Sequence, residues 1–433
     1  MSLQSFLNTV QQSVKQKNAE TIINCFVLDN SSPDIQNLTE QIAPLLQSSS
    51  KKNIKSKVKE KLSHWRGWTD LVMAFFEYLI TVRELDEYKE KTWMSLKHFY
   101  TCLATCFSSQ DTAWMVQLVE SASKFYVNIS LALDRESEGP NKYVSDTSRD
   151  VFRMFNIVLS DRQTNFKGSK REAVFTVANL LNRLYFRMQQ VRLCHTIQTN
   201  IISSGVTLSL GTTAERVTFE YYTGRCYLYQ HQIHQAYRHL STAFQQCPDE
   251  AHVQKRLCLL YLIVCQLILG RSPTKQLMMQ FQLEPMFSPL IACLKVGNIK
   301  GFIDALEAPN RLRWFVKRNI YLTLRDRCEI VLWRNLFRKV FLTTFSPTQK
   351  TPHVASAALL AAARFATQDD TYDEEDVECI CVSLIDQGYV KGYIIHSSGT
   401  LVLKRDESFG FEPIHAVQPV VMNNDAEDKF FGR

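Results

Sequence analysis

Apolar residues recur at intervals of three and four along most of the chain, which is the spacing of one buried face on an α-helix. The stretch 71–80 is typical, and its apolar residues are Leu71, Val72, Phe75, Phe76, Leu79 and Ile80. Comparable stretches follow one another from residue 68 to about residue 201. The pattern therefore predicts a succession of helices, interrupted by polar loops at 134–146 and 162–170.

From Thr213 onward the helical pattern becomes regular. A helix beginning at Thr213 is followed by a polar turn at 230–232 and by a second helix that ends near Pro248. Small residues stand where the two helices would approach each other: Gly224, Ala236 and Ala243. Two further helix pairs are predicted at 253–269 with 274–281, and at 287–296 with 299–307. Hairpins of this length resemble tetratricopeptide-type units, which stack into a right-handed superhelix.

The last third of the chain has a different pattern. Residues 313–345 are mostly helical, 347–352 form a linker, and 354–365 form a short Ala-rich helix. Asp373 caps a further helix that ends at Gly388. Its apolar face consists of Val377, Ile380, Cys381, Leu384 and Ile385. Two β-branched and aromatic runs, 389–395 and 400–404, flank a Ser-Ser-Gly turn and predict a β-hairpin. Three helices followed by a hairpin are the order of a winged helix.

These patterns divide the chain into four segments. We predict an N-terminal helical region at 1–210, a helical-repeat part at 211–320, a winged-helix part at 321–406 and a polar C-terminal tail at 407–433. The predicted fold class is all-α, a superhelix of helical hairpins followed by a winged helix.

Composition agrees with a helical, globular chain. Apolar residues make up 45% and charged residues 21% of the sequence, and only 14 glycines and 12 prolines are present, which disfavours a turn-rich β fold. The formal net charge of +7 permits an anionic partner without requiring one. Twelve scattered cysteines are expected to be reduced and mostly buried, as in a cytosolic or nuclear protein. No signal peptide is predicted, and the most apolar stretch, 257–269, is shorter than the ~20 residues of a membrane span.

No motif of a nucleotide-binding loop, a nucleophile elbow or a metalloprotease helix occurs in the sequence, so we predict no enzyme and no cofactor. Cys379 and Cys381 form a pair without companion ligands at zinc-site spacing. A metal site is also disfavoured at the three histidines His231, His234 and His239, because no carboxylate neighbours them at ligand spacing.

The most informative charge pattern lies on the predicted helix after residue 321. At 100° per residue, Arg327, Arg334 and Arg338 fall within a stripe about 40° wide. We consider two interpretations, pairing with acidic side chains and contact with nucleic-acid phosphates. The candidate nucleic-acid-binding residues are Arg327, Arg334, Arg338, Lys339, Lys391, Lys404 and Arg405. Base-specific readout is disfavoured, because the helix capped by Asp373 begins with acidic residues.

Three aromatic residues are candidates for partner binding: Trp314, Tyr389 and Tyr393. The two tyrosines, on the predicted hairpin, could stack on bases, although packing is the favoured interpretation. A lysine run at 51–61 is interpreted as the solvated face of a helix, with nuclear import or phosphate contact as the alternative.

Several segments resemble the PCI family, which occurs in the proteasome lid, the COP-nine signalosome and translation initiation complexes. They lie in the helical repeats at 215–225, 236–240 and 269–273, in the following helix at 334–340, and in the winged helix at 376–380 and 388–394. Within that family the chain is similar to the PCI subunit of the nuclear-pore-associated transcription-and-export complex, TREX-two, and to a COP-nine-like paralogue. The resemblance extends over about 213–404 and is weak before residue 170.

The resemblance implies an mRNA-export scaffold in the nucleus, at the envelope or pore, with the cytoplasm as a second location. It implies a larger PCI- or Sac-type scaffold partner, a small acidic protein shared with the proteasome lid, and RNA or DNA bound without sequence specificity. Two alternatives remain, the paralogue of a COP-nine-like or splicing-linked complex, and a purely structural proteasome-lid or signalosome subunit. We expect Arg334→Glu with Arg338→Glu to abolish nucleic-acid binding without unfolding the chain, and Leu384→Asp to unfold the winged helix.

Overall fold

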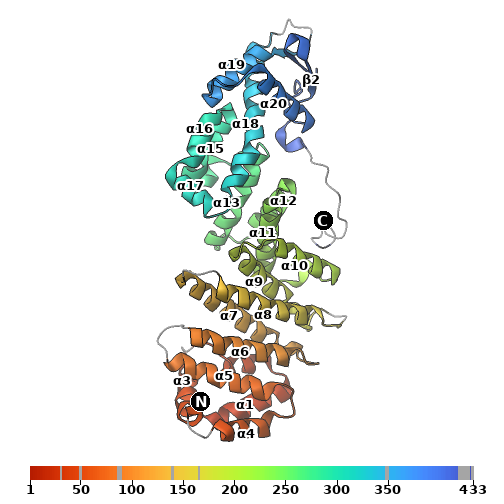
Figure 1. The fold of residues 1–433 in the computed structure, drawn as a ribbon. Helices are drawn as coiled ribbons and strands as arrows, with labels where there is room; N and C mark the ends of the chain where they lie inside the picture. Colours follow the sequence, from red (N-terminus) through yellow and green to blue (C-terminus); the bar gives the residue numbers. More distant parts are fainter. Residues whose placement is uncertain are drawn as a thin grey trace. The chain divides into compact units, whose positions relative to one another are not determined.

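The computed structural model describes residues 1–29, 32–47, 51–84, 90–137, 141–163, 166–346, 351–417 and 430 (Figure 1). Its contacts divide the chain into two compact units. The first unit comprises residues 1–226 with 424–433, and the second comprises residues 227–423. The division falls inside helix α11 (Thr213–Tyr229).

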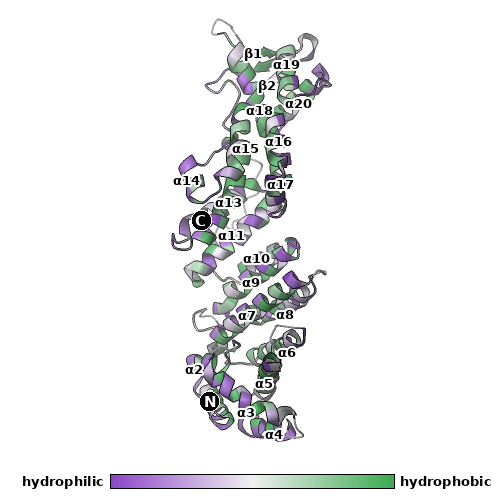
Figure 2. Cartoon of the chain, turned by 90° about the vertical axis from the view of Figure 1, so that its left-hand side faces the viewer, coloured by the Kyte–Doolittle hydropathy of each residue, from purple (hydrophilic) through white to green (hydrophobic). Residues whose placement is uncertain are grey.

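The first unit consists of consecutive packed helices. They are α1 (Leu3–Gln16), α2 (Ala19–Cys25), α3 (Pro33–Gln47), α4 (Lys51–Leu62), α5 (Trp68–Glu84), α6 (Glu90–Phe107), α7 (Val116–Glu136), α8 (Lys142–Leu159), α9 (Val174–Arg187), α10 (Arg192–Ser203) and most of α11, with short 3-10 turns η1 (Ala113–Met115), η2 (Lys170–Ala173) and η3 (Leu208–Leu210). Helix α5, largely green in Figure 2, packs against α6. An aromatic cluster holds this end together, since the Phe26 ring lies 4.9 Å from that of Phe75 and 6.0 Å from that of Phe99.

The lysine run at 51–61 forms helix α4, as predicted. Ile54, Val58 and Leu62 are buried on one face, because they recur at four-residue intervals. The lysines on the remaining faces are exposed, so their predicted solvated position is confirmed for Lys52, Lys55, Lys57 and Lys59. Contact with phosphate or an import receptor stays a prediction.

The predicted flexible loop at 134–146 is wrong at both ends. Helix α7 continues to Glu136 and helix α8 begins at Lys142. Asp134 is buried, and its carboxylate accepts hydrogen bonds from the backbone N–H groups of Tyr143 at 3.3 Å and Val144 at 2.7 Å. This carboxylate therefore satisfies two of the unpaired donors in the first turn of α8.

The second unit continues with helical hairpins and a long helix. Its helices before the sheet are α12 (Ile233–Gln246), α13 (His252–Ile268), α14 (Lys275–Gln280), α15 (Glu284–Val296), α16 (Ile299–Glu307), α17 (Pro309–Val316) and α18 (Tyr321–Thr344). The tight turn predicted between α15 and α16 is present, with Gly297 at φ 74° and Asn298 as the N-cap of α16. A side chain at Gly297 would place its Cβ 2.6 Å from the backbone of Leu336, so glycine allows this turn to lie directly on α18.

The winged helix closes the second unit. It contains α19 (Ser356–Thr367), α20 (Glu374–Asp386) and an antiparallel sheet of β1 (His353–Ala355), β3 (Thr400–Leu403) and β2 (Gly392–Ile395), in the order β1-β3-β2. The predicted cap is confirmed, because Asp373 and Asp376 form a reciprocal capping box at the start of α20. Leu384 is completely buried beneath this helix. Strand β1 was not predicted, since three residues carry too little alternation to indicate a strand.

The predicted all-α fold of tetratricopeptide-like hairpins with a C-terminal winged helix is confirmed, while the predicted superhelical handedness stays a prediction. Most cysteines are buried free thiols, as expected from their apolar surroundings. Cys381 is buried on α20, and Cys379 on the same helix is exposed.

Candidate nucleic-acid and partner surfaces

Helix α18 supports the candidate basic surface. Its buried side packs against α13, α15, α16 and α19 through Leu324, Cys328, Val331, Leu332 and Phe337. On its outer side, Arg327, Arg338 and Lys339 are exposed. Within the described ranges, no carboxylate lies at ion-pair distance from these three side chains, so their charges face solvent.

Arg334 differs from its predicted neighbours, and its assignment to the exposed basic stripe is wrong. Only 7% of the residue is exposed. Its Nη2 donates to the backbone carbonyls of Phe411 at 2.8 Å and Glu412 at 2.6 Å, and its Nη1 donates to Asn335 Oδ1 at 3.1 Å. Burial lowers the pKa of Arg334 to about 10, and the nearby charge of Arg338 contributes. This guanidinium is a structural clamp that a phosphate cannot reach.

Phe411 and Glu412, which Arg334 holds, lie in the stretch 407–433 that was predicted to be a polar tail. Its described part, to residue 417, instead folds back onto α18. The rings of Phe409 and Phe411 lie 5.4 Å and 6.0 Å from the ring of Phe341. Gly410, at φ 74°, accepts a hydrogen bond from Lys391 N at 2.7 Å, and a Cβ there would lie 2.3 Å from Lys391 O. The predicted tail is therefore wrong for residues 407–417.

Two of the basic residues near the hairpin, unlike those on the outer side of α18, have acidic partners. Lys391 pairs with Glu412 at 2.8 Å, and this hydrogen bond raises the pKa of Lys391. Lys404 lies 3.5 Å from Asp406. Backbone and hydroxyl donors at Gly410 and Ser408 lower the pKa of Asp406 to about 2, so this carboxylate stays ionised. Arg405 is exposed and has no ion-pair partner in the described part of the chain.

The three aromatic candidates occupy different surroundings. Trp314 is half-buried, with the Arg318 guanidinium 3.8 Å from its ring centroid and the Phe287 ring 5.9 Å away. Tyr393 on β2 is 59% exposed, so it is available to a partner. Tyr389 is half-buried, and burial raises its pKa. The sequence grouped these residues, but the structure does not bring them together into one described cleft.

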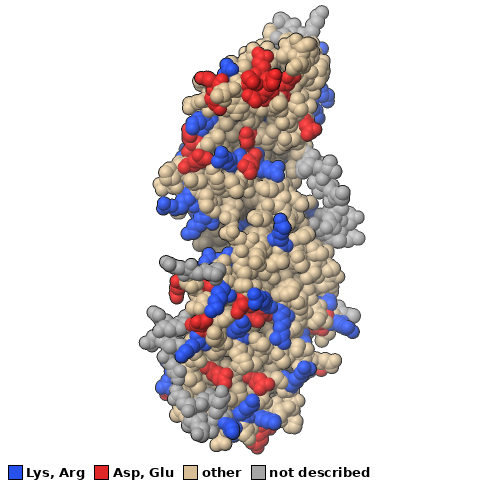
Figure 3. Space-filling model, in the orientation of Figure 1, with Lys and Arg blue, Asp and Glu red and all other residues tan. Residues whose placement is uncertain are grey.

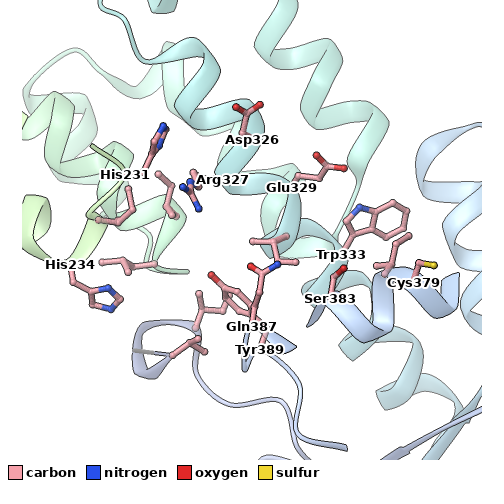
Figure 4. Close-up of a pocket in the computed structure, with 17 residues that line it drawn as sticks. His231, His234, Asp326, Arg327, Glu329, Trp333, Cys379, Ser383, Gln387 and Tyr389 are labelled. Carbon is pink, nitrogen blue, oxygen red and sulfur yellow. The ribbon is translucent and has the colours of Figure 1, made fainter. Parts of the chain in front are cut away.

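Tyr389 lines a cleft of about 690 Å³ inside the second unit (Figure 4). Its walls come from the start of α12, the end of α13, α18, α20 and residues 414–417. Its apolar lining consists of Ile233, Ile268, Leu269, Ile330, Trp333, Ile380, Ile414 and Val417. A cleft with this much apolar surface suits a side chain or segment of a protein partner.

The polar residues of the cleft carry both signs of charge. His231, with φ 63° in the turn before α12, lies beside Arg327, while Asp326 and Glu329 border the cleft from α18 (Figure 4). Burial and the Arg327 charge lower the pKa of His231, so this imidazole is held neutral over a wider pH range. The sequence did not predict this cleft, because its lining comes from segments far apart in the chain. The only hint of the cleft in the sequence was the pair of histidines, His231 and His234, in and next to a predicted turn.

The three histidines considered as metal ligands lie in two different places. His239 is buried with its ring stacked 5.2 Å from Tyr227, whereas His231 and His234 border the cleft. Among the residues that the structure describes, no group of three or more His, Cys, Asp or Glu side chains is arranged to hold a metal ion. The same residues include no helix long and apolar enough to span a bilayer.

Acidic side chains gather over α20 on the face shown in Figure 3. The first turn of this helix contains Glu374, Glu375 and Asp376. Their negative charges are stabilised there by the positive end of the helix dipole. A phosphate backbone would be repelled by this turn, and the expectation that α20 does not read bases stays a prediction. Any phosphate contact is therefore expected at α18 and Arg405.

A helical-repeat array that continues into a winged helix, with a partly apolar cleft and exposed basic side chains on α18, is the architecture of a scaffold-type protein. A family model of the PCI domain matches residues 308–405, and a model of PSMD3-like N-terminal TPR repeats matches residues 142–292. A PCI domain-containing protein of Schizosaccharomyces pombe is 51% identical, covering 100% of this chain and 99% of that protein. The chain therefore belongs to the PCI domain family.

Two further relatives carry more specific names. PCI domain-containing protein 2 of Xenopus laevis is 32% identical over 59% of this chain and 61% of that protein. A Protein CSN12 homolog of Neurospora crassa is 31% identical over 79% of this chain and 84% of that protein. None of these names is that of an enzyme, and the family is one of scaffold-type subunits of multiprotein complexes.

Proposed function

We propose that this protein is a non-catalytic scaffold subunit of a nuclear mRNA-export complex, and that it binds RNA or DNA through its winged-helix end. The observation that carries the proposal is the set of exposed arginines without ion pairs in the described chain, Arg327, Arg338 and Arg405. Arginine forks suit phosphate oxygens, and a contact of this kind is insensitive to base sequence. Lys339 adds a fourth exposed cation, whereas Lys391 and Lys404 are partly neutralised by acids of the same unit.

Protein partners would use other parts of the same unit. We propose that the cleft at Tyr389 receives one protein partner, because eight of its 17 lining residues are apolar and the cleft is open to solvent. The exposed Tyr393 on β2 is a second contact for the larger PCI- or Sac-type scaffold. A small acidic partner, of the kind shared with the proteasome lid, is a further part of the proposal. Arg327, which borders the cleft, would attract its carboxylates.

The nucleic-acid part of the proposal is tested by fluorescence anisotropy with a single-stranded RNA, titrated at rising salt. We expect affinity to fall steeply as salt increases, because phosphate contacts release counterions. Arg338→Glu with Arg405→Glu should weaken binding at least about tenfold, since two attractive contacts become repulsive. Arg334 is left unchanged, so that loss of binding does not arise from loss of folding.

A matched control carries the same change in net charge elsewhere. Lys15→Glu with Lys275→Glu alters two exposed lysines on α1 and α14, outside the winged helix. This double variant should keep nearly all of the affinity. Equal weakening by both double variants would show that net charge alone controls binding. No affinity even at low salt would favour the purely structural proteasome-lid or signalosome role.

A second candidate function is favoured by the similarity to the Neurospora crassa protein named CSN12 homolog, which covers 84% of that relative. In this alternative the chain is the paralogous PCI subunit of a COP-nine-signalosome-like or splicing-linked complex. Purification of the chain with its native partners, followed by mass spectrometry, separates the two candidates. Recovery of a large export scaffold supports the first, and recovery of signalosome-like or splicing-linked subunits supports the second.

The cellular location is part of the same proposal. A nuclear scaffold for mRNA export should be found in the nucleus and at the nuclear envelope or pore. Fluorescence imaging of the tagged chain in its own cells tests this location. An exclusively cytoplasmic signal would contradict the export role and leave the RNA-binding measurements unaffected.

A further inference from the structure

A second cleft lies wholly inside the first unit, apart from the surfaces considered above. Its volume is about 620 Å³, and it lies between α7, α9 and the segment from η3 to α11. Part of the lining is apolar and comes from Val116, Leu180, Leu210, Ala214 and Tyr222. The remainder includes three glutamates, Glu120, Glu172 and Glu215.

Two of these carboxylates compete for one hydroxyl donor. Thr176 Oγ1 lies 3.2 Å from Glu120 Oε1 and also within hydrogen-bond distance of Glu215 Oε1. A hydroxyl carries one hydrogen, so it can satisfy only one carboxylate at a time. Glu215 has other donors, since its Oε2 accepts from Thr212 N at 2.8 Å and from Thr212 Oγ1 at 2.7 Å. Among the described residues, Glu120 therefore has only Thr176 as a hydrogen-bond donor, and it shares that donor with Glu215.

Both signs of charge surround Glu120. Burial raises the pKa of Glu120, with the neighbouring Glu215 and Glu172 adding to the effect. Lys124, one turn further along α7, opposes this shift, but it forms no ion pair with Glu120 within the described part of the unit. Glu172 lies at the exposed edge, where its Oε1 accepts from Gly168 N at 2.8 Å.

Asn179 supplies an independent observation. The residue lines the cleft from α9 and is only 8% exposed. Its Nδ2 donates to the backbone carbonyl of Glu215 at 3.0 Å, which fixes the orientation of the amide. Its Oδ1 is buried and has no hydrogen-bond partner. Buried acceptors are satisfied in the great majority of cases, so this oxygen is left with capacity to accept a hydrogen bond.

A polar group that enters the cleft beside Glu120 and Asn179 would meet acceptor oxygens, so it would have to be a donor. A lysine ammonium carries three N–H donors and an arginine guanidinium five, and neither accepts. Their aliphatic stems can lie along apolar walls while the charged end reaches a carboxylate. Lys124, Lys167 and Arg183 also border the cleft, so a run of several basic residues would be repelled at its edge. One basic side chain between neutral or acidic neighbours fits best.

We propose that the cleft of the first unit binds a single lysine or arginine side chain of a partner protein, held by Glu120 and Asn179. The inference goes beyond the proposed function, because the nucleic-acid surface lies on the other unit and none of its residues is involved. It gives the first unit a recognition role of its own. The apolar lining residues, such as Leu180 and Leu210, would lie along the aliphatic stem.

The test uses the full chain and short capped peptides of the form acetyl-Gly-X-Gly-amide, observed by saturation-transfer NMR. X is arginine, lysine or citrulline, which has the shape of arginine without its charge. We expect the arginine or lysine peptide to bind at least about tenfold more tightly than the citrulline peptide, since a charge-assisted hydrogen bond is lost. Equal binding of the three peptides would overturn the proposal.

Substitutions then locate the binding position. Glu120→Gln should weaken binding of the basic peptide about tenfold, and Glu120→Lys should abolish it by placing a cation in the cleft. Glu136→Gln, on the exposed last turn of the same helix, is the matched control and should leave affinity unchanged. Unchanged affinity in both Glu120 variants would also overturn the proposal. Circular dichroism establishes folding, and the citrulline comparison on the unaltered chain decides the question if a variant does not fold.

Failure here is distinguishable from failure of the proposed function. Arg338→Glu with Arg405→Glu should affect RNA binding and leave peptide binding unchanged, whereas Glu120→Gln should do the reverse. If the winged-helix substitutions weaken peptide binding as strongly as Glu120→Gln does, the cleft of the first unit is not the binding position.

Discussion

Charged side chains serve different purposes in the first unit and at the winged-helix end of the second. In the first unit, Asp134 caps a helix, and the Lys170 ammonium donates to the Ser109 carbonyl at 2.7 Å although the residue is only 9% exposed. At the winged-helix end, Arg338 and Arg405 project into solvent without ion pairs among the described residues. The difference teaches that a charged side chain, acidic or basic, stabilises the fold when another segment of the chain covers it and forms hydrogen bonds with it.

The largest effect is expected from placing a charge inside the winged helix. Leu384→Asp should destabilise this end by more than about 4 kcal/mol, because it creates a cavity and buries an unpaired carboxylate. Thermal denaturation followed by circular dichroism measures the change. Val382→Asp on the same helix is the control, since Val382 is 53% exposed and should tolerate the charge. Similar melting curves for both variants would contradict the burial of Leu384.

Arg334 tests whether an arginine at the winged-helix end can behave like the buried charges of the first unit. Arg334→Ala should cost about 3 kcal/mol, because two backbone carbonyls lose a charged donor. Arg338→Ala, one turn away and exposed, should change stability by less than about 0.5 kcal/mol. Chemical denaturation of both variants gives the comparison. Equal stability would place Arg334 back among the solvent-facing residues.

The burial of Arg334 also changes what we expect of the double variant that the sequence suggested. Arg334→Glu with Arg338→Glu was expected to remove nucleic-acid binding and keep the fold. With Arg334 buried against Phe411 and Glu412, the double variant should unfold part of the winged-helix end. Its loss of binding would therefore say nothing about phosphate contacts.

Asp134 provides the corresponding test in the first unit. Asp134→Ala should destabilise the protein by about 2 kcal/mol, since two backbone N–H groups in the first turn of α8 lose their acceptor. Glu136→Ala, exposed two residues later, should have almost no effect. Hydrogen exchange at Tyr143 and Val144 would report the loss locally. Unchanged protection of these amides would contradict the cap.

The smallest effect is expected from the exposed pair of His396 and Glu378, whose atoms lie 2.8 Å apart. The hydrogen bond to Glu378 raises the pKa of His396 in the folded state. The pair therefore stabilises the protein below the ordinary histidine pKa of about 6.5, and this contribution disappears as pH rises through the raised value. Melting temperatures of the wild type and His396→Gln should differ slightly at pH 6 and coincide at pH 9. A gap that widens with pH would contradict the sign.

Local signals in the sequence predicted much of the second unit. The turn at Gly297 and the cap at Asp373 depend on neighbouring residues, so pattern and spacing were sufficient. Contacts between distant segments were not predictable in this way. The carbonyl of Phe411 lies 77 residues beyond Arg334, and strand β1 is defined only by its pairing with β3.

The candidate surfaces follow the same rule. The positions of Arg327 and Arg338 on the outside of α18 could be predicted from helical geometry, because the rest of the helix supplies the buried face. Both clefts depend on several helices meeting, and their lining residues are spread over more than 100 positions in each case. Asp134 was assigned to a loop because polar residues and Gly139-Pro140 follow it, and its carboxylate instead joins the helices on either side.

The clamp formed by Arg334 has a mechanical consequence. Because one guanidinium joins the middle of α18 to residues 411–412 of the segment that follows the β-hairpin, neither can shift without breaking charged hydrogen bonds. A force applied to the hairpin by a docked molecule would be transmitted along α18 toward the helical hairpins that pack on it. The end of the chain that meets a partner is thereby coupled rigidly to the helices behind it.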